Sequence, residues 1–181
     1  RGSAMTHNAI RKMVMLSLYA AIALALFVLE AQIPIPVAIP GVKLGLANVV
    51  TLLVLTQYRA RDAFAVLVVR ILLGSMFGGQ MVGFLYSMAG GLCCFFAMWG
   101  CSRLLHRKQL WFTSVIGAVF HNIGQILAAV WVMGSIQVLA YFPFLLLSGC
   151  ITGLFTGLAA GFLTSRMHPK SGKSSVSKWQ K

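Results

Sequence analysis

Acidic side chains are almost absent from this sequence, because Glu30 and Asp62 are the only two carboxylate residues among 181. Enzymes that act on diphosphates through Mg²⁺ need clustered carboxylates, since hard cations take oxygen ligands. Transporters driven by protons or Na⁺ commonly carry a relay of carboxylates within the membrane. One Asp and one Glu, far apart in the chain, fit neither design. We therefore expect no metal site, no cofactor and no catalytic residue.

Other motifs of chemistry are missing as well. The sequence has no HExxH motif and no serine–histidine–acid set with an available acid. Residues 171–174 (SGKS) resemble the end of a phosphate-binding loop, but Met167 stands where that pattern needs its first glycine. We expect no ATP hydrolysis by this chain. The cysteines form no CxxC pair and lie in apolar runs, so we interpret them as small packing residues. They are Cys93, Cys94, Cys101 and Cys150.

Charge is scarce and apolar residues dominate. Charged residues make up 9% of the chain and hydrophobic residues 59%, whereas soluble domains carry about 25% charged residues. The mean hydropathy is +0.88. A spanning helix needs about 20 mostly apolar residues. The sequence therefore predicts an all-α integral membrane bundle of about six transmembrane helices. The expected spans are residues 13–29, 44–58, 63–77, 81–101, 110–133 and 144–163.

The remaining segments define the expected domain organisation. We interpret residues 1–4 as a tag remnant before a natural start at Met5. Residues 5–165 form a single membrane domain, and residues 166–181 form a basic cytoplasmic tail, which we expect to be flexible. Residues 33–41 contain prolines that cannot continue a helix, so they are expected to form a loop.

All of the 15 Lys and Arg residues except Arg70 lie outside the expected spans, and they are distributed in a regular way. With the N-terminus inside, the inner segments hold all the basic clusters and the outer loops hold only Lys43. This asymmetry follows the positive-inside rule and predicts that both termini lie in the cytoplasm. We therefore interpret the basic clusters as anchors to anionic lipid headgroups and expect no nucleic acid partner.

Polar side chains at membrane depth are costly and indicate function. Arg70 lies near the expected middle of the third span. Two interpretations are open: a fixed ion pair with Glu30, or contact with an anionic cargo. In the fifth span, His121 and Gln125 share a helix face and Asn122 lies beside it. They are either satisfied core residues or ligand contacts.

Further polar groups extend this set towards the outside. Together they predict a net-positive pocket that opens outwards and suits a small anionic or amphipathic ligand. The candidate substrate-binding residues are Lys43, Asn48, Thr51, Arg70, Gln80, His121, Asn122 and Gln125.

Two spans carry faces of small residues, which let a neighbouring helix approach closely. One is Ala21 and Ala25 in the first span. The other, in the last span, is either internal packing or a docking groove for another protein. It consists of Gly149, Gly153, Gly157 and Gly161.

Three segments carry a family resemblance: residues 39–51 (IPGVKLGLANVVT), 70–79 (RILLGSMFGG) and 121–125 (HNIGQ). Together they resemble the Gx transporter family, often labelled heptaprenyl diphosphate synthase component I. That family is similar to the S components of energy-coupling factor (ECF) importers. The resemblance covers about residues 10–165.

The resemblance implies a six-helix S component that binds a vitamin-like micronutrient outside a prokaryotic cytoplasmic membrane. It implies docking on a membrane T component, through Ala21 and Ala25, and energy from two cytoplasmic ATPases. Two alternatives remain open at this point. The chain is an accessory membrane subunit of a prenyl diphosphate synthase, or it is a stand-alone channel or facilitator.

The expected topology gives a direct prediction. A reporter active only outside the cytoplasm, such as a periplasmic phosphatase, should stay inactive when it is fused after Lys181, because the basic tail holds that end inside. The same reporter inserted beside Pro36 in the expected outer loop should be active. High activity of the C-terminal fusion would reverse the topology.

Overall fold

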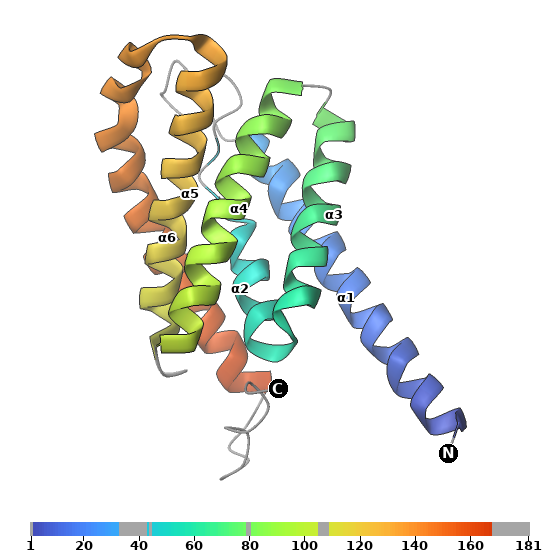
Figure 1. Cartoon of the computed structure of the whole chain (residues 1–181). Helices are drawn as coiled ribbons and strands as arrows, with labels where there is room; N and C mark the ends of the chain where they lie inside the picture. Colours follow the sequence, from blue (N-terminus) through green and yellow to red (C-terminus); the bar gives the residue numbers. More distant parts are fainter. Residues whose placement is uncertain (1, 33–42, 44, 79–80, 105–108, 168–181) are drawn as a thin grey trace.

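The computed structural model describes residues 2–32, 43, 45–78, 81–104 and 109–167, and these ranges contain no strand. Figure 1 shows the helices standing side by side as a bundle, with α2 in its middle. The all-α fold is therefore confirmed. In chain order the helices are α1 (Gly2–Ala31), α2 (Asn48–Gln57), α3 (Ala60–Gly78), α4 (Met81–Leu104), α5 (Leu110–Met133), the short 3-10 helix η2 (Ile136–Tyr141) and α6 (Phe142–Met167).

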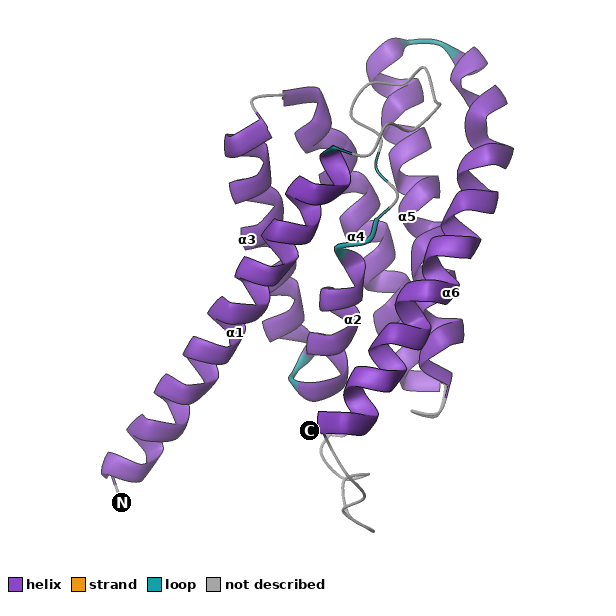
Figure 2. Ribbon diagram, turned by 180° about the vertical axis from the view of Figure 1, so that it is seen from behind, coloured by secondary structure: helices purple, strands orange, loops and turns teal. Residues whose placement is uncertain are grey.

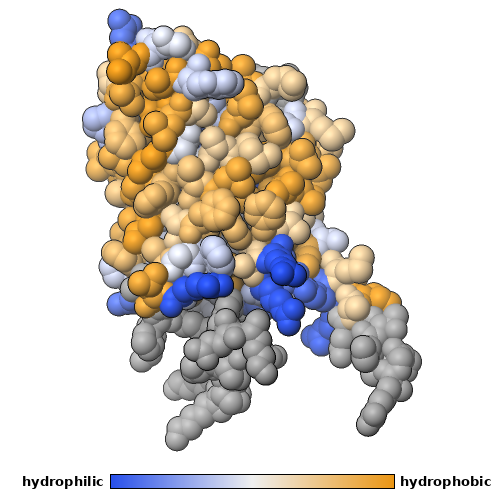
Figure 3. Space-filling model, in the orientation of Figure 1, coloured by the Kyte–Doolittle hydropathy of each residue, from blue (hydrophilic) through white to orange (hydrophobic). Residues whose placement is uncertain are grey.

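Four segments of the described chain are long and apolar enough to cross a membrane: Ala9–Glu30, Met81–Leu104, Leu110–Met133 and Ile136–Arg166. Their large apolar side chains are exposed, as Trp131 and Phe155 illustrate. The visible side of the bundle is mostly hydrophobic, and the strongly hydrophilic residues gather at its lower end (Figure 3). An apolar surface of this extent needs lipid around it, so this is a membrane protein.

The two ends of the helical bundle lie on the same side. The start of α1 and the end of α6 are both at the lower end in Figure 1, and the reverse view in Figure 2 agrees. This is the arrangement that an even number of crossings produces. Which side faces the cytoplasm stays a prediction from the distribution of basic residues.

The helix boundaries differ from the expected ones where local chemistry sets them. The third helix begins at Ala60 rather than Ala63. The Asp62 carboxylate accepts a hydrogen bond from the backbone N–H of Arg59 at 3.1 Å, which satisfies a donor in the turn that leads into α3. The sixth helix continues to Met167, two residues beyond the expected domain end, and residues 168–181 lie outside the described part of the chain.

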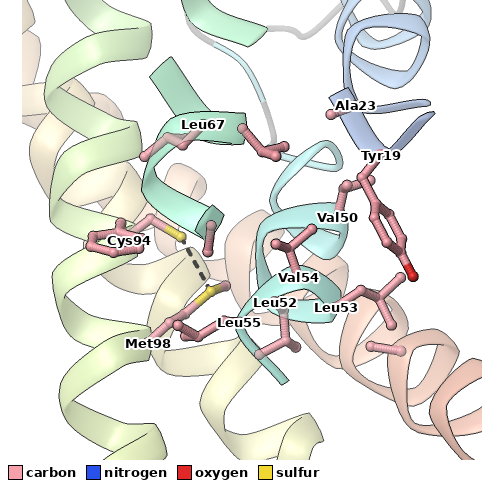
Figure 4. Close-up of a cluster of buried hydrophobic side chains, with 14 of the residues drawn as sticks. Tyr19, Ala23, Val50, Leu52, Leu53, Val54, Leu55, Leu67, Cys94 and Met98 are labelled. Carbon is pink, nitrogen blue, oxygen red and sulfur yellow. Dashed lines mark hydrogen bonds between the residues drawn. The ribbon is translucent and has the colours of Figure 1, made fainter. Parts of the chain in front are cut away.

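Helix α2 is shorter than its expected span of 44–58. Its 10 residues cover about 15 Å, half the thickness of a bilayer core. Almost every residue of α2 is buried, which is typical of a helix enclosed by others. Figure 4 shows its side chains surrounded by residues of neighbouring helices. They include Tyr19 and Ala23 of α1, Leu67 of α3, and Cys94 and Met98 of α4.

The helices differ in how closely they pack. Helix α5 packs most extensively, against α4 and α6, whereas α1 packs mainly on α3 and less on α2. Within the window of each segment that can cross a membrane, 44% of α5 is buried, but only 22% of α1 and of the segment that contains α6. At the terminal end, Lys12 of α1 forms an ion pair with Asp62 at 2.7 Å. Tyr19 also donates to Gln57 at 2.9 Å.

The glycine face of α6 is used inside the chain. A Cβ atom on Gly149, Gly153 or Gly157 would lie within 3 Å of atoms of α5. The interpretation of internal packing is therefore the right one for these three residues, because α5 occupies the groove that a partner would need. Gly161 differs, since a Cβ there would meet no described atom within 4 Å. The alanines on α1, Ala21 and Ala25, are exposed.

A matched pair of alanine substitutions tests this packing. The Cβ of Gly157→Ala would lie 2.5 Å from the Cα of Trp111 and push the α5 backbone away. We expect a loss of about 1–3 kcal/mol in stability. Gly161→Ala adds a methyl group in open space and should change stability little. Thermal unfolding of both variants in the same detergent measures the difference. Equal melting temperatures would contradict the observed α5–α6 contact.

Candidate ligand-binding site

The site begins where the main chain enters the bundle without helical structure. Gly45, just before α2, has φ of 86°, a left-handed conformation that glycine adopts without cost. A Cβ at this position would lie 2.8 Å from Asn48 Nδ2 and 3.1 Å from His121 Cδ2. Only glycine therefore lets this turn lie so close to α5.

Gln125 fixes this entering segment to α5. With its amide oxygen facing His121, it accepts hydrogen bonds from His121 Nε2 at 3.1 Å and from the backbone N–H of Lys43 at 3.2 Å. Its amide nitrogen donates to the backbone carbonyl of Lys43 at 3.0 Å. Lys43 lies outside any helix, so the Gln125 amide provides the hydrogen bonds that a helix would give to its backbone N–H and C=O groups. Since His121 Nε2 is the donor here, Nδ1 is left as an acceptor.

Arg70 lies deep in the bundle, with 3% of its side chain exposed. Its Nη2 donates to Asn48 Oδ1 at 3.2 Å. Glu30 at the end of α1 is equally buried, and it accepts a hydrogen bond from the backbone N–H of Gly45. No ion pair within 4.0 Å joins Glu30 to Arg70; between side chains of the described ranges, that distance is reached only by Lys12 and Asp62. The fixed Glu30–Arg70 pair is therefore not formed.

Lys43 reaches into the same region from the entering segment. Its Nζ atom lies 3.1 Å from the centre of the Phe27 ring, a cation–π contact. Such a contact is worth about 0.5–2 kcal/mol. It holds the ammonium group without a counter-charge in direct contact. Phe27 in turn packs against Gly74 of α3, where no side chain would fit.

These groups enclose a small cavity with room for about one water molecule. It lies in the half of the bundle away from the termini, because the end of α1 and the beginning of α4 line it. The lining residues are Phe27, Glu30, Lys43, Gly45, Arg70, Ser87 and His121.

Several buried polar atoms at the site have no hydrogen-bond partner among the described residues. They are Arg70 Nε, Asn48 Nδ2, Ser87 Oγ and His121 Nδ1. An unsatisfied buried polar atom costs about 1–3 kcal/mol. Arg70, Ser87 and His121 also line the cavity. Two donors and one acceptor left open in the lining, with a third donor on Asn48 next to Arg70, form an arrangement that can take up a polar ligand group.

The chain matches the sequence model of heptaprenyl diphosphate synthase component I over residues 19–163. It belongs to this family. The family is also known as the Gx transporter family. The matched range runs from α1 into α6 and includes every residue that lines the cavity. No curated protein matches the chain. No solved structure matches it either.

The structure brings together part of the residue set expected for the binding site. Lys43, Arg70 and His121 line the cavity, and Asn48 lies behind Arg70. Gln125 holds the backbone of Lys43 and does not line the cavity.

Two expected residues lie elsewhere, and a third falls outside the described part of the chain. Asn122 donates to the carbonyl of Leu145 on α6, away from the cavity. Thr51 is buried on α2 and is not part of the lining. Gln80 lies outside the described residues.

Some lining residues of the cavity were not among the expected binding residues. Phe27 and Ser87 carry no signal in the sequence, because a Phe or a Ser in an apolar helix is ordinary. Gly45 lies within the family-like segment 39–51. Glu30 directly follows the first expected span, as Asp62 directly precedes the third, and the sequence suggested it only as an ion-pair partner of Arg70.

Replacing Gln125, which holds the Lys43 backbone against α5, gives a prediction. Gln125→Leu keeps the approximate volume but leaves Lys43 N–H, Lys43 C=O and His121 Nε2 unsatisfied. We expect a stability loss of about 2 kcal/mol or more and faster hydrogen exchange at the Lys43 amide. Exchange mass spectrometry in nanodiscs measures the second effect. Gln137→Leu, at an exposed glutamine, is the control. Unchanged exchange at the Lys43 amide would refute the hydrogen bonds between Gln125 and the Lys43 backbone.

Proposed function

We propose that this chain is the substrate-binding (S) subunit of an ECF-type importer in a prokaryotic cytoplasmic membrane. The observation that carries the proposal is the buried cavity with two cationic side chains and open hydrogen-bonding atoms, in a helical bundle surrounded by lipid. Buried polar groups of this kind are costly, so they are retained where they bind something. A small anionic or amphipathic, vitamin-like molecule is the cargo that such a lining suits.

The position of the cavity supports capture from outside. It lies in the half of the bundle away from both termini, and the basic clusters predict that the termini are cytoplasmic. The cavity is then nearer the outer surface. Residues 33–41 precede the Lys43 segment and contribute no ionisable side chain.

The energy for uptake has to come from other proteins. The sequence has no complete phosphate-binding loop and no relay of carboxylates, because its two acids are Glu30 and Asp62. We therefore assign the energy to two cytoplasmic ATPases that act through a membrane T component. The exposed alanines on α1, Ala21 and Ala25, are the proposed docking face.

The family description names a component of a synthase, which supports a second role as a membrane accessory to a prenyl diphosphate synthase. Chain elongation on diphosphates needs clustered carboxylates to hold Mg²⁺. Among the described residues no group of three His, Cys, Asp or Glu could hold a metal ion. We therefore do not assign the chemistry itself to this chain.

Co-expression tests the leading proposal. The chain, carrying an affinity tag, should retain a T component and its two ATPases through purification in mild detergent. The double variant Ala21→Leu/Ala25→Leu should lose them, because two larger side chains separate the helix faces. Ala140→Leu, at an exposed alanine of η2, is the control and should keep the complex. Quantitative mass spectrometry of the eluate measures all three.

Two other outcomes would replace this proposal. If the purified chain alone gives liposomes permeable to small anions, it is a channel or facilitator. If it binds no ATPase module but increases the product yield of a soluble prenyl diphosphate synthase, it is an accessory subunit of that enzyme.

A further inference from the structure

The charge of the cavity can be counted from its lining. Lys43 and Arg70 contribute two positive charges and Glu30 one negative charge. The neighbouring residues 33–42 and 44 add no ionisable side chain. His121 uses Nε2–H to bind Gln125 and presents its unprotonated Nδ1. Counted by formal charges, the cavity therefore carries a net charge of +1.

Glu30 lies at the cavity without cancelling either cation by direct contact. Its carboxylate is held by the backbone N–H of Gly45, and no nitrogen of Lys43 or Arg70 lies within 4.0 Å of it. With 2% of its side chain exposed, it is poorly screened by water. Charges in such a medium act on each other several-fold more strongly than in water. An incoming anion thus meets two cations and one fixed repelling group.

The buried donors without a hydrogen-bond partner at and beside Arg70 suit one oxyanion group of a ligand. Arg70 Nε, Asn48 Nδ2 and Ser87 Oγ are the donors without a partner in the described structure. Arg70 Nη2 is already bound to Asn48. One edge of the guanidinium therefore remains for the ligand, which can bind a carboxylate through adjacent N–H groups.

We propose that Glu30 determines the specificity of this cavity by limiting its ligand to a single negative charge, as in a carboxylate. This rests on the proposed function, since it assumes that the cavity holds the cargo. A monoanion brings the net charge to zero. A phosphate monoester with two charges leaves an excess of one, and a diphosphate leaves a larger excess. An uncompensated buried charge is strongly unfavourable. The ligand class is then carboxylate-like, and prenyl diphosphates are rejected.

Two probes with the same ring test the charge rule at pH 7: benzoate, with one negative charge, and phenyl phosphate, with about 1.5 to 2. Their affinities are measured by thermal stabilisation of the full chain in nanodiscs of phosphatidylcholine, which has no net charge. For the wild type we expect benzoate to bind at least about tenfold more tightly than phenyl phosphate. Glu30→Gln keeps the shape, raises the net charge to +2 and should shift this ratio by about tenfold or more towards phenyl phosphate.

Three variants serve as controls. Asp62→Asn removes the other acid, which lies in the first turn of α3, at the end of the bundle that holds the termini. It should leave the ratio of the two affinities unchanged. Glu30→Asp keeps the charge and should keep the preference for benzoate. Arg70→Met should weaken both probes. If Glu30→Gln does not fold, the wild-type ratio and Glu30→Asp still decide the question.

The proposal is overturned if the wild type prefers phenyl phosphate, if neither probe binds, or if Glu30→Gln binds both probes with an unchanged ratio. Failure of the importer assignment is a separate result. Loss of the ATPase module in co-purification leaves the probe ratio as it is, because that ratio is measured on the chain alone.

Discussion

The need to satisfy every polar group inside a membrane governs this structure. The chain enters the middle of the bundle as a non-helical segment, and α2 then begins at Asn48 and covers only about half of a bilayer. The surrounding lipid offers no partner for free N–H and C=O groups. The side chains of Gln125 and Glu30 provide partners for Lys43 and Gly45 instead. Both side chains hold this backbone, and the cavity lies beside it.

This arrangement explains why the site combines rigid and open groups. The backbone of the entering segment is bound on both sides, by α5 through Gln125 and by α1 through Glu30. The groups that point into the cavity from α3, α4 and α5 keep unpaired atoms. Ligand binding at such a site costs little conformational entropy, because the backbone that supports the site is already ordered. The unpaired atoms in the cavity remain available to the ligand.

Much of the fold was predictable from apolar length. Helix α5 has the expected bounds, since residues 110–133 form a long apolar run between a basic cluster and Gly134. The beginning of α2 was not predictable in this way, because residues 44–47 are as apolar as the helix that follows. The decisive feature there is the positive φ of Gly45, which hydropathy does not report. The start of α3 depends on a single carboxylate, Asp62, and not on apolar length.

The site was predictable only where a polar residue stood out against apolar neighbours. Lys43, Arg70 and His121 were found for this reason and do line the cavity. The same rule selected Asn122, which instead binds Leu145 on α6, because a polar residue in a helix can serve either side of that helix. Phe27 contributes through its ring face, and nothing in its sequence context distinguishes it from other core aromatics.

Helix α1 combines two surfaces on one stiff rod. Its last turns carry Phe27 and Glu30 to the cavity, while Ala21 and Ala25, one to two turns earlier, are exposed on its outer face. The rod is loosely embedded, and it is tied at its far end to the α2–α3 hairpin by Lys12 and Asp62. Because both surfaces lie on one continuous helix, a displacement of α1 would move the cavity wall and the outer face together. A partner bound at Ala21 and Ala25 would therefore contact the same helix that carries Glu30 to the cavity.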